Sequence, residues 1–212
     1  MSEIYVVIGP PRSGTTLVAG ILHLCGVPMF PSLEKAIYQN QGDEWNQGGH
    51  FADADFHELI ATFLPGLHLP DPAWTPDAGT VSTIQALISE RSVAPKWGIK
   101  GMNAWIGAKI LAGMGHDVRV IRTSRPVEQS QASYTERIGD AYKESAPAFV
   151  SSAKSLADAF YDEFPNDKKM TVDFDSIYDN TQTTVDSISA FAGVASTPEA
   201  VAFVVPSRRR FG

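Results

Sequence analysis

The chain has 212 residues, of which 43% are hydrophobic and 19% are charged, and its formal net charge at pH 7 is -7. This length and composition predict a single globular domain over residues 1–212 and exclude a globally disordered chain. The acidic balance excludes a protein that coats nucleic acid. The single cysteine excludes an intramolecular disulfide. Because no apolar run reaches roughly 18 residues, we expect a cytoplasmic protein that does not span a membrane.

The first predicted element is a strand over Ile4–Ile8, a continuous run rich in β-branched residues (IYVVI) that is typical of a strand buried on both faces. It leads directly into the turn GPPRSGTT, residues Gly9–Thr16. Beyond the turn, apolar residues recur at helical spacing as far as Leu24, and Gly26 is placed to end that helix. The N-terminus therefore predicts a strand, a glycine-rich turn and a helix.

The rest of the chain alternates between the same two kinds of element. Strands are predicted over Lys96–Lys100, Asp117–Thr123 and Lys168–Phe174, and helices over about 53–63, 81–92, 105–114, 127–137, 148–164 and 181–191. Strands separated by helices are typical of βαβ units. The sequence thus predicts an α/β fold of three layers, with a central parallel β-sheet flanked by helices.

The turn Gly9–Thr16 has the length of a phosphate-binding P-loop and lies where a parallel sheet binds its ligands. Gly9 and Gly14 permit backbone conformations that a Cβ would obstruct, and the following helix directs free N–H groups to the same place. Arg12 adds a permanent charge with a planar fork of donors. Hydroxyl groups are added by Ser13, Thr15 and Thr16. A plain Gly/Pro turn is the simpler interpretation, but it does not explain why all these features occur together in this order.

A triphosphatase P-loop carries a lysine where this chain has Thr15. Thr16 keeps the position of the hydroxyl that binds magnesium, and the nearest candidate for a second magnesium ligand lies late in the chain, in VDFD at Val172–Asp175. A nucleotide kinase or another phosphotransferase with an altered loop is therefore one alternative. A non-catalytic nucleotide-binding protein is another.

GPPRSGTT resembles the 5′-phosphosulfate-binding loop of the sulfotransferase family, whose members carry P-[KR]-[ST]-G-T-[TSW] on a P-loop-like fold. These enzymes transfer a sulfuryl group from 3′-phosphoadenosine 5′-phosphosulfate (PAPS) to a hydroxyl or amine. The resemblance implies that Arg12 bridges the leaving phosphate and the sulfuryl group, that the product is 3′,5′-bisphosphoadenosine (PAP), that no metal is required, and that the acceptor is a small molecule or glycan. The other loop positions that it implies for the cofactor are Pro11, Ser13, Gly14, Thr15 and Thr16.

A second segment, VRVIRTSRPVEQSQASY at Val118–Tyr134, resembles the part of the family in which an Arg and a Ser eight positions later grip the 3′-phosphate. Arg125 and Ser133 meet this pattern. A strand that ends before Arg125 and a helix that begins after it place both residues on about the same face. Arg122 and Ser130 share the spacing, but Arg122 is alternatively an ion-pair partner on the strand, and Arg125 is alternatively a solvent-exposed arginine at the helix start.

WGIK, which ends at Lys100, resembles the W-G-x-K of many bacterial sulfotransferases and implies that Lys100 reaches the leaving-group oxygens. Cytosolic members place a catalytic His two residues beyond the comparable Lys, where this chain has Met102. The candidates for the general base are therefore Glu34, which lies after the first helix, and His50 and Asp53, which lie in a segment similar to another family motif. His50 is alternatively an exposed loop residue, and Asp53 a first-turn acid of a helix.

The C-terminal VVPSRRRFG resembles an Arg-rich ending found in the family. It implies that Arg209, with its neighbours Arg208 and Arg210, closes over the nucleotide phosphates, although a solvated basic tail is equally consistent with the sequence. The segment from about 28 to 95 is predicted to cover the acceptor in a partly apolar pocket. Its aromatic residues are Trp45, Phe51, Phe56, Phe63 and Trp74.

Overall fold

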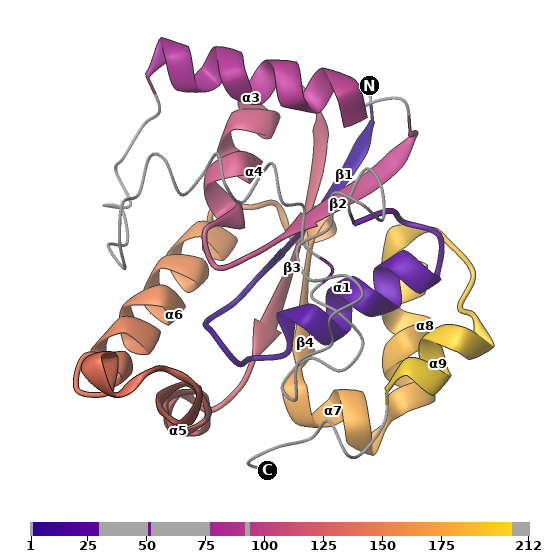
Figure 1. Ribbon diagram of the computed structural model, residues 1–212. Helices are drawn as coiled ribbons and strands as arrows, with labels where there is room; N and C mark the ends of the chain where they lie inside the picture. The colour runs from indigo at the N-terminus through magenta and orange to yellow at the C-terminus, as the bar shows by residue number, and fades with distance from the viewer. Residues whose placement is uncertain (1, 30–50, 52–76, 92–93, 205–212) are drawn as a thin grey trace.

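The computed structural model describes residues 2–29, 51, 77–91 and 94–204, and a parallel sheet lies at its centre (Figure 1). The strand order is β2-β1-β3-β4. The strands are β1 (Glu3–Ile8), β2 (Lys96–Lys100), β3 (Asp117–Ser124) and β4 (Lys169–Asp173). All the pairings are parallel, so the predicted α/β fold with a parallel sheet is confirmed.

Helices cover both faces of this sheet, as the predicted three-layer arrangement requires (Figure 1). On one face, Ile4, Val6 and Ile8 of β1 pack with residues of α3 (Ala78–Arg91), α4 (Ala104–Gly113) and α6 (Ala146–Asp162). On the other face, Tyr5 and Val7 pack with α1 (Thr15–Leu24), α7 (Phe174–Asp179), α8 (Thr181–Ala192) and α9 (Pro198–Phe203). β1 is therefore buried on both sides, which explains its continuous apolar sequence.

The remaining elements join β3 to β4. α5 (Val127–Arg137) follows β3, and the short 3₁₀ turns η2 (Asp140–Tyr142) and η3 (Asn166–Lys168) lie before and after α6. β2 and α5 have the bounds that the sequence predicts, and the other predicted elements among the described residues are offset by three residues at most. Within these residues, no helix combines the length and the hydropathy needed to cross a bilayer.

Two short helices, α7 and α9, were not predicted. Both have a side-chain cap at the N-terminus: Asp173 accepts a hydrogen bond from the N–H of Ser176, and Thr197 accepts one from the N–H of Ala200. Pro198 at the first position of α9 is a further start signal. These helices have six residues each, too few for an apolar period to emerge, so only their start signals could have predicted them.

Candidate functional site

The turn after β1 depends on two glycines that lie too close to neighbouring side chains for a Cβ. A Cβ on Gly9 would lie 2.2 Å from Oγ1 of Thr123 on β3, and one on Gly14 would lie 2.9 Å from the ring of Phe174. Gly14 also has φ 97° and precedes α1, and its carbonyl accepts hydrogen bonds from the N–H groups of Leu17 and Val18, the third and fourth residues of that helix. The sequence needs glycine here so that the turn can sit against β3 and α7.

Ser13 fixes the shape of this turn from inside. Its side chain is buried, and its Oγ lies 2.7 Å from the carbonyl oxygen of Pro10 and 2.6 Å from Oγ1 of Thr123. The hydroxyl predicted to bind phosphate is therefore engaged within the protein. Ser13 thus holds the turn, while the two hydroxyl-bearing residues after Gly14 remain partly exposed.

Arg12 lies within the turn and has φ 68°, a left-handed conformation that non-glycine residues rarely adopt. Its Nε donates a hydrogen bond of 3.1 Å to Oγ of Ser133 on α5, and its carbonyl oxygen accepts one of 3.0 Å from Nη1 of Arg125. The strained residue is thus held by both members of the second motif. The two segments that the sequence singles out, more than one hundred residues apart, meet directly.

The structure distinguishes the two Arg–Ser pairs of equal spacing. Arg125 is 3% exposed, bonds Oε1 of Gln129 and has its guanidinium 4.0 Å from the ring centroid of Phe174, so the solvent-exposed interpretation of Arg125 is wrong. Arg122 forms an ion pair of 2.9 Å with Asp158, as its alternative interpretation predicts. Ser130 is fully buried, and its hydroxyl has no hydrogen-bond partner in the described part of the chain. Only the later pair reaches the turn.

Lys100 supplies a second cation from the neighbouring strand. It is the last residue of β2, in register with Val7 of β1, and its Nζ donates a hydrogen bond of 2.8 Å to Oγ1 of Thr16. Burial, together with the positive charges of Arg137 and Arg12, lowers the pKa of Lys100 to about 7. The hydroxyl that holds magnesium in a triphosphatase loop is here bound to an ammonium group.

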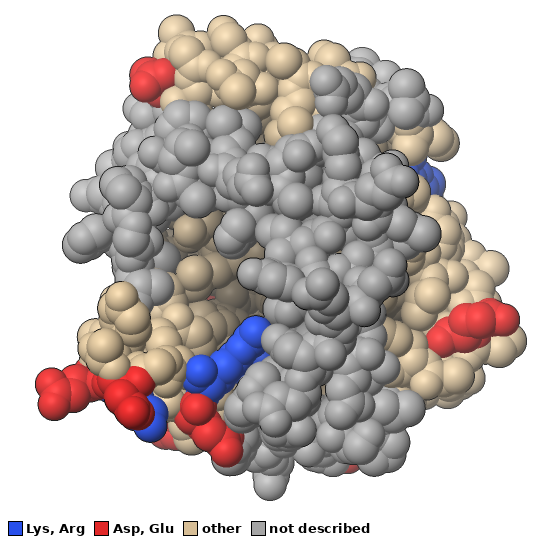
Figure 2. All heavy atoms as spheres, in the orientation of Figure 1, with Lys and Arg blue, Asp and Glu red and all other residues tan. Residues whose placement is uncertain are grey.

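In Figure 2, Lys and Arg side chains lie on the surface where Figure 1 shows the turn between β1 and α1. The site lies at the carboxyl edge of the sheet, where parallel α/β proteins bind their ligands. In the described part of the chain, no group of three or more His, Cys, Asp or Glu residues is placed to hold a metal ion.

The sequence analysis did not single out one polar residue that follows Lys100 closely in the chain. Asn103 precedes α4, three residues beyond Lys100, and its Oδ1 is buried without a hydrogen-bond partner. An unsatisfied buried oxygen costs about 1–3 kcal/mol. No local pattern marks this asparagine, since it resembles an ordinary helix-start residue. Met102, at the position of the family's histidine, is partly exposed between Lys100 and Asn103.

Several predicted residues lie outside the described ranges. They are Glu34, His50, Asp53, Arg208, Arg209 and Arg210, together with the predicted helix 53–63. Phe51 is described, and its ring lies 5.6 Å from that of His23 on α1 and 5.3 Å from that of Phe203 on α9. It belongs to a local aromatic cluster over α1.

The sequence matches no family model and no curated protein. Solved structures do match. The sulfotransferase domain from the curacin biosynthetic pathway superposes with a TM-score of 0.58 and 14% identity over 98% of this chain and 80% of that one. The sulfotransferase domain of the Synechococcus PCC 7002 olefin synthase superposes with a TM-score of 0.53 and 16% identity, over 95% of this chain and 76% of that one. Sulfotransferase STF1 from Mycobacterium tuberculosis H37Rv superposes with a TM-score of 0.53 and 17% identity, over 96% of this chain and 70% of that one. The chain therefore has the fold of these sulfotransferases.

Proposed function

We propose that this protein is a sulfotransferase that takes a sulfuryl group from PAPS and transfers it to a hydroxyl or amine of an acceptor. The observation that carries the proposal is the contact between the two motifs, in which Arg12 bonds Ser133 and Arg125 bonds the carbonyl of Arg12. A loop suited to one phosphate and an Arg–Ser pair suited to another are thereby adjacent. A donor with phosphates at both the 5′ and the 3′ position fits such a pair of subsites.

The residues present suit the chemistry of sulfuryl transfer. The acceptor oxygen or nitrogen bonds to sulfur as the bond between sulfur and the phosphate oxygen breaks, and negative charge moves onto the leaving phosphate. We assign the stabilisation of that charge to Arg12, Lys100 and the N-terminus of α1, since Arg12 lies in the turn before this helix and Lys100 bonds Thr16 in its first turn. Fixed donors that stabilise charge in the transition state are usually the largest source of catalysis. Thr16 orients the Lys100 ammonium for this task.

The kinase alternative is disfavoured by two contacts. The hydroxyl of Thr16 is bound by Lys100, and the carboxylate of Asp173 caps α7 by accepting hydrogen bonds from the N–H and the hydroxyl of Ser176. Thr16 and the first carboxylate of VDFD, two of the candidate magnesium ligands of a phosphotransferase, are thus engaged with protein. A like charge at Lys100 further opposes a divalent cation beside Thr16.

The acceptor must also lose a proton, and Met102 cannot take it. Glu34, His50 and Asp53 are the proposed bases. Replacing the true base by its neutral isostere (Glu34→Gln, His50→Gln or Asp53→Asn) lowers turnover by about 10²–10⁴ and leaves PAP affinity within two-fold. A variant that loses PAP affinity and keeps its turnover removes that residue from the role.

Nucleotide binding tests the proposed donor directly. PAP should raise the melting temperature more than AMP does, because only PAP carries the 3′-phosphate, and ATP with magnesium should be no better than AMP. Ser133→Ala should remove the preference for PAP, whereas Ser130→Ala should keep it, since Ser130 is equally buried on the same helix but does not contact Arg12. Equal stabilisation by PAP and AMP in the wild type contradicts the proposal.

A further inference from the structure

Phe174 touches both of the motifs that the proposed donor needs. It is the first residue of α7 and directly follows Asp173 of β4, which pairs in parallel with Ser124 of β3. Arg125 directly follows Ser124, so the register of the two strands brings Arg125 and Phe174 side by side at the carboxyl edge of the sheet. There the guanidinium carbon of Arg125 lies 4.0 Å from the centroid of the Phe174 ring.

The same ring packs against the turn after β1. A Cβ on Gly14 would lie 2.9 Å from Cδ2 of Phe174 and 3.5 Å from its Cε2, so the ring lies directly against the backbone at this end of the turn. Nη1 of Arg125 donates to the carbonyl oxygen of Arg12, two residues earlier in the same turn, at 3.0 Å. The turn, the guanidinium and the ring therefore each contact the other two, and none can shift in a close-packed interior without disturbing the others.

The ring is itself held in place by the fold. Phe174 is 5% exposed, and its ring packs edge-on against that of Tyr178, with 5.4 Å between the centroids. Its backbone follows the cap of α7, in which the carboxylate of Asp173 accepts hydrogen bonds from the N–H and the hydroxyl of Ser176. Since Arg125 is only 3% exposed, little water competes with the ring for its charge, and cation–π contacts are strongest when they are desolvated.

The face and the edge of the Arg125 guanidinium have different partners. The Phe174 ring lies against the face, whereas the N–H donors lie in the guanidinium plane. Two of these donors bond Oε1 of Gln129 and the carbonyl oxygen of Arg12. An arginine binds phosphate through the same in-plane donors. The ring therefore fixes the direction of the guanidinium without using a group that a phosphate needs.

We propose that Phe174 is a positioning residue that couples the two phosphate subsites of the donor. It holds Arg125 and the Gly14 end of the turn at a fixed separation. The site thereby favours a nucleoside with phosphates at both the 3′ and the 5′ position over a nucleoside with one phosphate. This inference rests on the proposed function, which assigns the turn to the 5′ group and Arg125 to the 3′-phosphate.

Calorimetry of the full chain with PAP and AMP tests the coupling, and the ratio of the two affinities is the measured quantity. Phe174→Leu should lower the preference for PAP by about ten-fold, because the cation loses the ring face. AMP affinity should stay within two-fold, because leucine keeps an apolar contact with the turn. Phe174→Tyr keeps the ring and should keep the preference. If Phe174→Leu does not fold, Phe174→Met fills a similar space without a ring and takes its place.

Phe191→Leu is the matched control, because the guanidinium carbon of Arg119 lies 6.0 Å from the centroid of the Phe191 ring at the opposite edge of the sheet. It removes a ring from beside an arginine away from the turn, and it should leave the preference for PAP within two-fold.

Two results overturn the role of Phe174. One is an unchanged preference for PAP in a folded Phe174→Leu or Phe174→Met. The other is a loss of PAP and AMP affinity by the same factor, which a merely structural role predicts. Failure of the donor proposal is distinct from both, since it shows in the wild type as equal affinity for PAP and AMP, before any substitution is made.

Discussion

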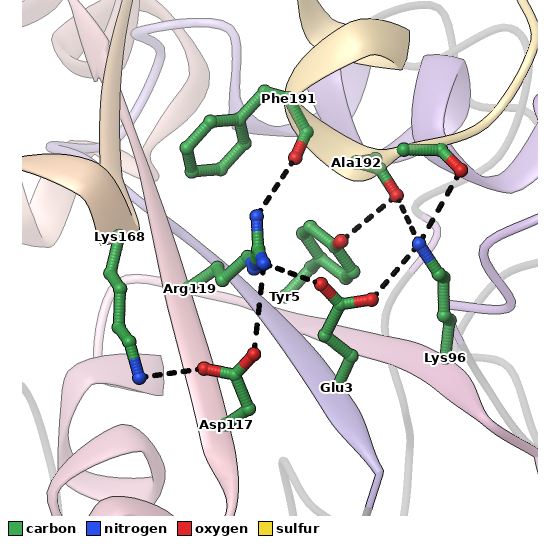
Figure 3. A network of polar contacts seen from close by, with 9 residues as sticks. Glu3, Tyr5, Lys96, Asp117, Arg119, Lys168, Phe191 and Ala192 are labelled. Carbon is green, nitrogen blue, oxygen red and sulfur yellow. Dashed lines mark hydrogen bonds and ion pairs between the residues drawn. The ribbon is translucent and has the colours of Figure 1, made fainter.

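The two edges of the sheet carry the same kinds of cation and use them differently. At the amino edge, Glu3 of β1 lies between Lys96 at 2.9 Å and Arg119 at 2.8 Å, and Asp117 pairs with Lys168 at 2.8 Å (Figure 3). At the carboxyl edge, the contacts described for Arg12, Lys100 and Arg125 are to hydroxyls, an amide and a carbonyl. Charge is balanced by carboxylates of the fold at the first edge, whereas the proposed function assigns the cations of the second edge to the phosphates of the donor.

The amino edge also anchors a helix. Lys96 donates to the carbonyl of Ala192 at 2.6 Å, Arg119 donates to that of Phe191 at 3.4 Å, and the hydroxyl of Tyr5 donates to Ala192 at 2.9 Å (Figure 3). These carbonyls are at the C-terminus of α8, where positive charge is stabilising. The cations of the amino edge therefore stabilise the fold. The comparison predicts that substitutions at the amino edge change stability, and that substitutions at the carboxyl edge change ligand affinity or rate.

The largest effect is expected at Arg12. Arg12→Ala should lower kcat by about 10²–10³, or roughly 2–4 kcal/mol, because a charge-assisted contact that strengthens in the transition state is lost. PAP affinity should change little, since PAP lacks the sulfuryl group, and Arg12→Lys should recover much of the rate. Steady-state kinetics with PAPS and calorimetry with PAP measure the two quantities. Wild-type turnover in Arg12→Ala, or an effect confined to PAP affinity, contradicts this role.

The contrast between the edges was only partly predictable from the sequence. The glycines, Arg12 and the Arg125–Ser133 spacing lie in local patterns, so both motifs could be located before the fold was known. The contact of Lys100 with Thr16 joins residues 84 positions apart and depends on the register of β2 with β1. The buried Oδ1 of Asn103 and the engaged hydroxyl of Ser13 likewise arise only from packing.

An intermediate effect is expected from the titration of Lys100. Its pKa of about 7 lies below the usual value because the charged form is buried among cations, and a bound polyanion favours that form again. Binding of PAP must therefore take up a proton above pH 7, and the affinity should fall by up to about ten-fold per pH unit between pH 7 and 9, where phosphates are fully ionised. Calorimetry in buffers of different ionisation enthalpy measures the uptake. A PAP affinity that does not change with pH contradicts this proton uptake. Lys100→Met should abolish the pH dependence of the affinity.

Lys100 at the carboxyl edge and Asp117 at the amino edge make the free energy of unfolding depend on pH in two different ranges. The unfolded chain binds more protons at Lys100 than the folded one between pH 7 and about 10.5, so the free energy of unfolding contributed there rises with pH. Asp117 has its pKa lowered by Lys168, so its contribution is present above the ordinary carboxylate pKa and is lost as the pH falls through the folded value. Lys168→Met should therefore weaken the acid dependence of unfolding and leave the dependence above pH 7 unchanged. Denaturant unfolding at each pH measures both.

The smallest effect is expected at Glu3, and it decides whether the edges are independent. Glu3→Gln leaves Lys96 and Arg119 without their shared carboxylate, but these side chains are about one-third exposed and keep their bonds to α8. Solvent screening limits the loss to about 1 kcal/mol, which lowers the melting temperature of a chain of this length by about 2–4 °C. Asp140→Asn, which breaks the exposed pair with Lys143, is the control and should leave the melting temperature unchanged. Turnover and PAP affinity should stay at wild-type values in both variants, because Glu3 begins β1 and the ligand-binding turn follows its other end. A loss of turnover in Glu3→Gln comparable to that in Arg12→Ala would mean that the amino-edge ion pairs position the catalytic turn through β1, and that the balanced and the ligand-directed charges form one system.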